Sequence, residues 1–143
     1  MRKAHFHRCV LSYLKSEVRG VRTARIISIV DDDEAVCAAT SGLVRSLGWQ
    51  ANVFASPEAF LQSSRVSETS CIISDVRMPR MSGVEMHARL LQLGYALPII
   101  FVTAFPTAVL RAKVMANGAL TLLEKPVDPT AIERYLVLVL GKP

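Results

Sequence analysis

The chain has 143 residues, about half of them hydrophobic and a fifth charged, which favours one folded domain and excludes a disordered chain. No uncharged apolar run approaches the roughly 20 residues that a membrane-spanning helix requires. The formal net charge of +5 comes wholly from residues 1–24, because residues 25–143 contain eleven basic and eleven acidic residues; the body therefore gives no electrostatic reason to bind nucleic acid.

Residues 1–24 are interpreted as a basic extension, and the body begins at residue 25. The extension lacks the continuous apolar core of a secretory signal. Its apolar residues Val10, Leu14, Val18 and Val21 recur at helical spacing, which would suit a helix that binds a partner or a membrane surface. A flexible tail, or a reading frame begun upstream of its natural start, explains the same residues, and we favour that interpretation. The three cysteines show no C-x-x-C spacing, which argues against a zinc site and fits a reducing cytoplasm.

From residue 25 onward, strand signals and helix signals alternate along the chain. Apolar runs predict the strands, and helical periodicity with capping residues predicts the helices that follow them. The five predicted strands are Ile26–Val30, Gln50–Phe54, Cys71–Ser74, Pro98–Thr103 and Leu120–Leu123. Of the five predicted helices, one follows Glu34, one begins at Ser56-Pro57, one begins at the capping box Ser82-x-x-Glu85, one spans Pro106–Asn117, and the last runs from Asp128-Pro129 to about Leu140.

This strict alternation predicts an α/β fold with a parallel sheet and helices on both of its faces. The first, third and fourth strands are the most apolar, so we place them in the middle, which gives the flavodoxin-like strand order 2-1-3-4-5. In the first helix, Val36, Ala39, Leu43 and Leu47 share the face that we expect to lie on the sheet, and Gly48 ends the helix.

Polar residues stand at the carboxyl end of each central strand. Asp31 and Asp32 follow the first strand, Asp75 the third, Thr103 ends the fourth, and Lys125 follows the fifth. In a parallel sheet these ends meet at one edge, and three carboxylates gathered there would repel one another. A hard divalent cation such as Mg²⁺ or Mn²⁺ relieves that repulsion. A carboxylate, a metal ion, an ammonium group and a hydroxyl are together the parts that receive a phosphoryl group.

Each of these residues also has a simpler explanation when it is taken alone. The run from Asp31 to Glu34 could merely cap a helix and favour its dipole. Asp75 could be an ordinary loop residue, Thr103 a strand end, and Lys125-Pro126 a turn. Their coincidence at successive strand ends is what favours a functional site.

The sequence resembles the receiver domain of two-component response regulators over about residues 25–141. The stretches that carry this resemblance are Val30-Asp31-Asp32-Asp33-Glu34, Ile73-Ser74-Asp75-Val76-Arg77-Met78-Pro79-Arg80-Met81-Ser82-Gly83, Val102-Thr103-Ala104, and Gly118-Ala119 followed by Glu124-Lys125-Pro126. The second stretch is most similar to regulators that carry a helix-turn-helix output domain of the nitrogen-fixation and nitrate-response type.

The resemblance implies that Asp75 is the phosphoacceptor of a sensor histidine kinase. It implies a Mg²⁺ site in which Asp32 is a direct ligand and Asp31 reaches the metal largely through water. Asp75 itself and the backbone carbonyl of Arg77 would complete the protein ligands.

The resemblance also assigns roles to two further strand ends. Thr103 would bond a phosphoryl oxygen, and Lys125 would pair with the phosphate after a cis Lys125–Pro126 bond. One position departs from the family, because Leu122 stands where an aromatic residue usually acts as a rotameric switch. No helix-turn-helix sequence follows the last helix, so we expect the output to be absent or to lie on another chain.

The last two predicted helices are more apolar than packing on a sheet requires. In the last helix, Val137, Leu138 and Leu140 lie off the inward stripe, which comprises Ile132, Tyr135, Leu136 and Val139. In the resembled family, this region is where phosphorylated receivers dimerise. We therefore expect a homodimer, or a contact with another regulator, through these helices.

Two other functions remain open at this point. One is a pseudo-receiver, a module of the same fold that binds partners without phosphorylation. The reason to retain this alternative is Leu122, which replaces the usual aromatic switch residue. The other is a phosphatase of the haloacid-dehalogenase type with Asp31 as its nucleophile. The Asp-x-Asp-x-Thr motif of that class is only half present, because position 35 is Ala. We favour the receiver that accepts a phosphoryl group on Asp75 over both alternatives, and we expect a signalling domain that is not an enzyme.

Overall fold

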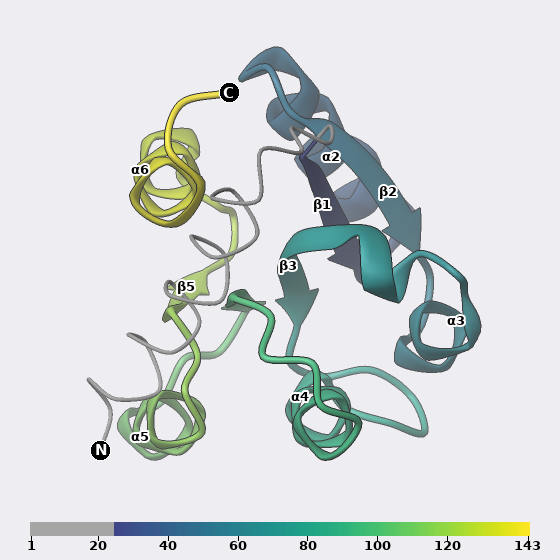
Figure 1. Ribbon diagram of the computed structural model, residues 1–143. Coiled ribbons are helices and arrows are strands. Elements are labelled where there is room, and N and C mark those ends of the chain that lie inside the picture. Colours follow the sequence, from purple (N-terminus) through teal and green to yellow (C-terminus); the bar gives the residue numbers. More distant parts are fainter. Residues whose placement is uncertain (1–24) are drawn as a thin grey trace.

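The computed structural model describes residues 25–143, so every expectation for residues 1–24 lies outside the described residues. Five strands form one parallel sheet in the order β2-β1-β3-β4-β5 (Figure 1), which confirms the predicted fold class and strand order. The strands are β1 (Ile26–Val30), β2 (Gln50–Phe54), β3 (Thr69–Asp75), β4 (Ile99–Thr103) and β5 (Thr121–Glu124).

Five α-helices alternate with the strands in the described part of the chain. They are α2 (Glu34–Ser46), α3 (Pro57–Gln62), α4 (Gly83–Gln92), α5 (Ala108–Ala116) and α6 (Pro129–Leu140), with a short 3₁₀ helix η1 (Val66–Glu68) before β3. The helix α5 begins two residues later than predicted, because the Thr107 hydroxyl accepts the Leu110 amide and caps the helix. Within residues 25–143, no helix is long and apolar enough to cross a membrane.

The sheet lies between two helical layers (Figure 1). Helices α2 and α6 cover one face, and α3, α4 and α5 cover the other. The central strands are buried on both sides, so alternate residues of one strand enter different core clusters; Ile73 and Ile72 of β3 are an example. This burial fixes the carboxyl ends of β1, β3 and β4 relative to one another, and the functional residues stand there.

The inward face of α2 differs from the predicted one. Its buried residues are Cys37, Thr40, Ser41 and Val44, whereas the predicted Ala39 is exposed and the other predicted residues are half-buried. Small side chains can lie closest to the sheet here because their polar atoms bond to nearby carbonyls. The Cys37 thiol donates to Asp31 O (3.2 Å), and the Ser41 hydroxyl donates to a carbonyl one turn earlier.

The last helix also departs from expectation, at Leu140 and at Val137. Leu140 is predicted to face outward, but its side chain is buried in the core between the sheet and the helices α2 and α6. Val137 is half-buried against the same core, whereas Leu138 is 59% exposed, as predicted. The extra burial arises because α6 packs on the sheet through to its last turn, and Gly141 ends it.

Candidate functional site

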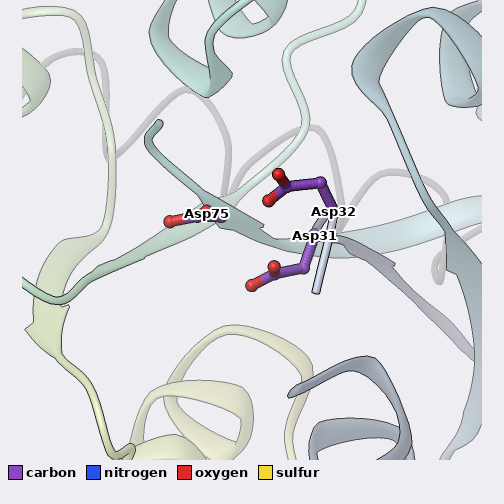
Figure 2. A group of neighbouring side chains, drawn as sticks. All are labelled: Asp31, Asp32 and Asp75. Atoms are coloured by element: carbon purple, nitrogen blue, oxygen red, sulfur yellow. The ribbon is translucent and has the colours of Figure 1, made fainter. Parts of the chain in front are cut away.

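Three carboxylates converge at the carboxyl edge of the sheet (Figure 2). Asp31 and Asp32 follow β1 and Asp75 ends β3, and one carboxylate oxygen from each lies within 4.8 Å of the others. Asp31 and Asp75 are buried, with 2% and 8% of their surfaces exposed, whereas Asp32 is open to solvent. The sequence therefore predicted the members of this cluster correctly.

The third aspartate of the run has a separate, structural task. The Asp33 carboxylate accepts the amides of Ala35 and Val36 and caps α2. Its own amide donates to Asp31 Oδ1 at 2.9 Å, which fixes the orientation of that carboxylate. The helix cap thus holds Asp31 in place without taking part in the cluster.

Lys125 brings the only positive charge that the described residues place against these carboxylates. Its Nζ donates to Asp31 Oδ2 at 2.8 Å and lies 3.4 Å from Asp75 Oδ1. Burial alone would lower the pKa of Lys125, but the hydrogen bond that Lys125 donates to Asp31 and the negative charge of Asp75 more than offset this effect, so the pKa is raised. The Lys125–Pro126 peptide bond is cis, as the resemblance implied.

One carboxylate oxygen of Asp75 accepts a backbone hydrogen bond, and the negative charge of this side chain is unfavourable where it lies. Its Oδ1 accepts the Val76 amide at 2.9 Å. Burial, together with the negative charge of Asp31, raises the pKa of Asp75 in spite of the nearby ammonium group. A carboxylate that is desolvated and next to another is a site that a cation would stabilise.

Thr103 stands at the end of β4, the strand that pairs with β3, and Arg77 follows Asp75 by two residues. Thr103 ends β4, is 2% exposed, and its hydroxyl accepts the Phe105 amide at 3.3 Å. Its carbonyl accepts the Lys125 amide at 2.9 Å, which ties the ends of β4 and β5 together. Arg77 lies in the exposed segment two residues after Asp75, before α4.

Sequence reasoning missed how closely α4 approaches Asp75. Gly83 opens α4, and its amide donates to Val76 O at 2.9 Å. A Cβ on Gly83 would overlap Asp75 O and lie 2.9 Å from Ser74 Oγ. The glycine in the Met-x-Ser-Gly stretch could have signalled this contact, because a glycine at a helix start often permits close backbone approach.

The donor set fits a hard divalent cation. The three clustered side chains offer only carboxylate oxygens, which are the ligands that Mg²⁺ prefers. The chemistry of these residues is therefore consistent with a site for such a cation.

Comparisons with known proteins agree with this geometry. The response regulator receiver domain family matches residues 27–136. The response regulator protein TmoT of Ectopseudomonas mendocina is 42% identical over 101 residues, which are 71% of this chain and 46% of TmoT. The transcriptional regulatory protein FixJ of Azorhizobium caulinodans is 34% identical over 116 residues, which are 81% of this chain and 55% of FixJ. The chain spans about half the length of the curated relatives it matches.

Solved structures show the same fold. The crystal structure of FixJ-N matches with a TM-score of 0.71 and 29% identity, covering 80% of this chain and 92% of that one. The Vibrio cholerae chemotaxis protein CheY4 matches with a TM-score of 0.73 and 28% identity, covering 82% of this chain and all of that one. By sequence and by fold, the chain belongs to the receiver domains of response regulators in two-component phosphorelay signalling.

Proposed function

We propose that residues 25–143 accept a phosphoryl group on Asp75 from a sensor histidine kinase in the cytoplasm. The observation that carries this proposal is the cluster of Asp31, Asp32 and Asp75 with the Lys125 ammonium bridging two of its members. The family supports it as well, because receiver domains are phosphorylated by such kinases.

Four groups would hold Mg²⁺ at this edge of the sheet: the carboxylates of Asp31, Asp32 and Asp75 and the backbone carbonyl of Arg77. The ion, when bound, would offset negative charge on the transferred phosphoryl group. Asp33 takes no part, because its carboxylate caps α2.

In the transfer, a carboxylate oxygen of Asp75 attacks phosphorus in line with the phosphorus–nitrogen bond of a phosphohistidine. That bond breaks, its electron pair leaves with the imidazole, which takes a proton from solvent, and an acyl phosphate forms on Asp75. Lys125 would balance the charge of the phosphoryl oxygens, and the Thr103 hydroxyl would donate to one of them. The chain is then the recipient of the group rather than an enzyme that turns over a substrate.

A labelled small phosphodonor tests the acceptor residue directly. Wild type incubated with phosphoramidate and Mg²⁺ should gain one phosphoryl group, which mass spectrometry should locate on Asp75. Asp75→Asn should reduce labelling by roughly a hundredfold or more, since an amide is a poor nucleophile. The matched control is Asp33→Asn, which makes the same change at a nearby aspartate that caps α2 and lies outside the cluster, and which should keep the wild-type labelling. Label retained in Asp75→Asn at the wild-type rate would refute the assignment.

A metal titration tests the ligand assignment separately. Asp32→Ala should weaken Mg²⁺ binding more than Asp33→Ala does, because only the first removes a carboxylate from the cluster. Chelation of the metal should stop labelling of the wild type. Equal losses of affinity in the two variants would contradict the proposed ligand set.

We further propose that phosphorylation strengthens a homodimer, or a contact with another regulator, through α5, β5 and α6. Val109 and Leu138 are large apolar side chains that the described structure leaves mostly exposed on these helices. Leu122 stands where the family usually has an aromatic switch residue, and it is buried in the core. A change at Thr103 would therefore reach this surface without an aromatic side chain that changes its rotamer.

The two alternatives have less support. A pseudo-receiver would not need an intact acceptor cluster, and the absence of any acyl phosphate on Asp75 in the labelling experiment would establish that reading. A phosphatase that used Asp31 would be labelled there instead. Residues 25–143 hold equal numbers of basic and acidic residues, so their net charge does not favour direct binding of nucleic acid. We propose residues 1–24 as a separate extension.

A further inference from the structure

Ser74 is a fully buried polar residue immediately before Asp75 in β3. Successive residues of a strand point to opposite faces, so Ser74 lies on the side away from Asp75. Its hydroxyl donates to Asp75 O at 2.8 Å. A buried hydroxyl that bonds to the backbone of the acceptor residue has no part in the mechanism described so far.

The peptide group that Ser74 contacts also holds the acceptor carboxylate. The N–H of this group belongs to Val76 and donates to Asp75 Oδ1 at 2.9 Å and to Val102 O at 3.1 Å. One N–H is therefore shared between the carboxylate and β4. The tilt of the peptide plane decides how strongly this N–H bonds to the carboxylate and how strongly it bonds to Val102 O.

The space around this peptide group is tightly packed. An added Cβ on Gly83 would overlap Asp75 O and lie 2.9 Å from Ser74 Oγ and 3.1 Å from Phe101 Cε1. The Gly83 amide also donates to Val76 O, so the start of α4 is fixed against the same segment. Without the Ser74 hydroxyl, the Asp75 carbonyl would lose a donor in a place where packed atoms leave little room for water.

We propose that Ser74 is a positioning residue for phosphoryl transfer, whose hydroxyl sets the peptide plane that aims the Asp75 carboxylate. With the plane fixed, the Val76 N–H holds one carboxylate oxygen and leaves the other free to face phosphorus. The bonds run in series from hydroxyl to carbonyl and from N–H to carboxylate, so they reinforce one another. This proposal rests on the proposed function of Asp75.

Phosphorylation kinetics test the proposal against a matched control. Ser74→Ala should slow labelling by phosphoramidate at saturating Mg²⁺ by about fivefold or more, because orientation contributes directly to the barrier. Ser74→Cys, which keeps a weak donor, should fall between Ser74→Ala and the wild type. The control is Ser28→Ala: Ser28 is equally buried on the neighbouring β1 but bonds to Thr69 at 2.7 Å. It should lose stability and keep the wild-type labelling rate.

A second measurement needs no phosphodonor. Hydrogen exchange of the Val76 amide should become faster in Ser74→Ala than in Ser28→Ala when both are compared at equal stability. Equal labelling rates in these two variants, or unchanged Val76 exchange, would overturn the role of Ser74. A wild type that takes no label would instead overturn the function of Asp75, and the exchange measurement would still decide whether Ser74 sets this peptide.

Discussion

Ionisation of Asp75 is unfavourable in the folded protein, because burial and the charge of Asp31 raise its pKa. A protonated Asp75 therefore stabilises the fold, and that contribution is lost as the pH rises from the ordinary value of about 3.9 through the raised one. Without divalent cations at pH 7, Asp75→Asn should be more stable than the wild type by a few degrees in melting temperature. The fluorescence of Trp49, the single tryptophan and a buried one, reports the unfolding.

The pH dependence distinguishes this cause from a general effect of the amide. The advantage of Asp75→Asn should shrink as the pH is lowered toward the ordinary carboxyl value, where the wild-type carboxyl also becomes neutral. Saturating Mg²⁺ should narrow the difference at pH 7. Identical melting curves at pH 7 without metal would show that Asp75 carries no ionisation cost.

Lys125 should be important for stability as well as for chemistry. Its ammonium is 2.8 Å from Asp31, whose side chain is 2% exposed, so Lys125→Met leaves a buried carboxylate without its partner. We expect a loss of about 2 kcal/mol, between the values for exposed and fully buried pairs. Urea unfolding measures it, with exposed Lys113→Met as a control that should stay within about 0.5 kcal/mol. Equal effects of the two substitutions would mean that the pair contributes nothing.

At the scale of an element, two helical glycines give opposite expectations for the same substitution. Gly83 lies against the Asp75 carbonyl, whereas nothing lies within 4 Å of a Cβ placed on Gly42 in α2. Gly83→Ala should destabilise by about 1–3 kcal/mol, because α4 must shift away from β3. Gly42→Ala should stabilise by roughly 0.5–1 kcal/mol through helix propensity alone.

Urea unfolding of the two glycine variants, together with the labelling rate, checks this expectation. The shift of α4 should also slow labelling in Gly83→Ala, since its first turn contacts the segment that carries Asp75. Stabilisation of both variants would show that α4 is free to move at no cost.

The elements were predictable from the sequence to different degrees. The caps Ser56, Ser82 and Asp128 are local signals, and the structure places them as predicted. The face of α2 was not predictable, because apolarity alone does not show that a thiol and hydroxyls can bond to nearby carbonyls and be buried. The end of α6 is a run of apolar residues with no polar contrast, so periodicity could not assign Leu140 to the core.

For the whole molecule, the exposed apolar side chains predict where it associates. Leu138→Glu should abolish the proposed phosphorylation-dependent dimer in analytical sedimentation, and it should change stability by less than about 0.5 kcal/mol, because the side chain is largely exposed. The control is Leu93→Glu, a similarly exposed leucine just after α4. A wild type that stays monomeric with phosphodonor would refute self-association, and a loss of dimer only in Leu93→Glu would place the contact elsewhere.

The fold and the acceptor cluster were predictable because the relevant signals are strong and local. Apolar strands that end in Asp31, Asp75 and Thr103 place those residues at one edge by topology alone. The sequence places Ser74 directly before Asp75, but it does not show that the Ser74 hydroxyl bonds to the Asp75 carbonyl in the packed space beside α4. The members of the carboxylate cluster were therefore predictable from the sequence, whereas the hydrogen bonds that orient them required the structure.

The contact between Lys125 and Asp31 joins residues 94 positions apart in the chain. Contacts of such high sequence separation form only after the intervening chain has closed a long loop, which makes them late and slow events in folding. The acceptor site is therefore incomplete until the segment after β5 has docked across the carboxyl edge. During synthesis, a nascent chain that has reached only β4 lacks the ammonium group of the proposed site, so that site can be assembled only after β5 and the segment that follows it have been added.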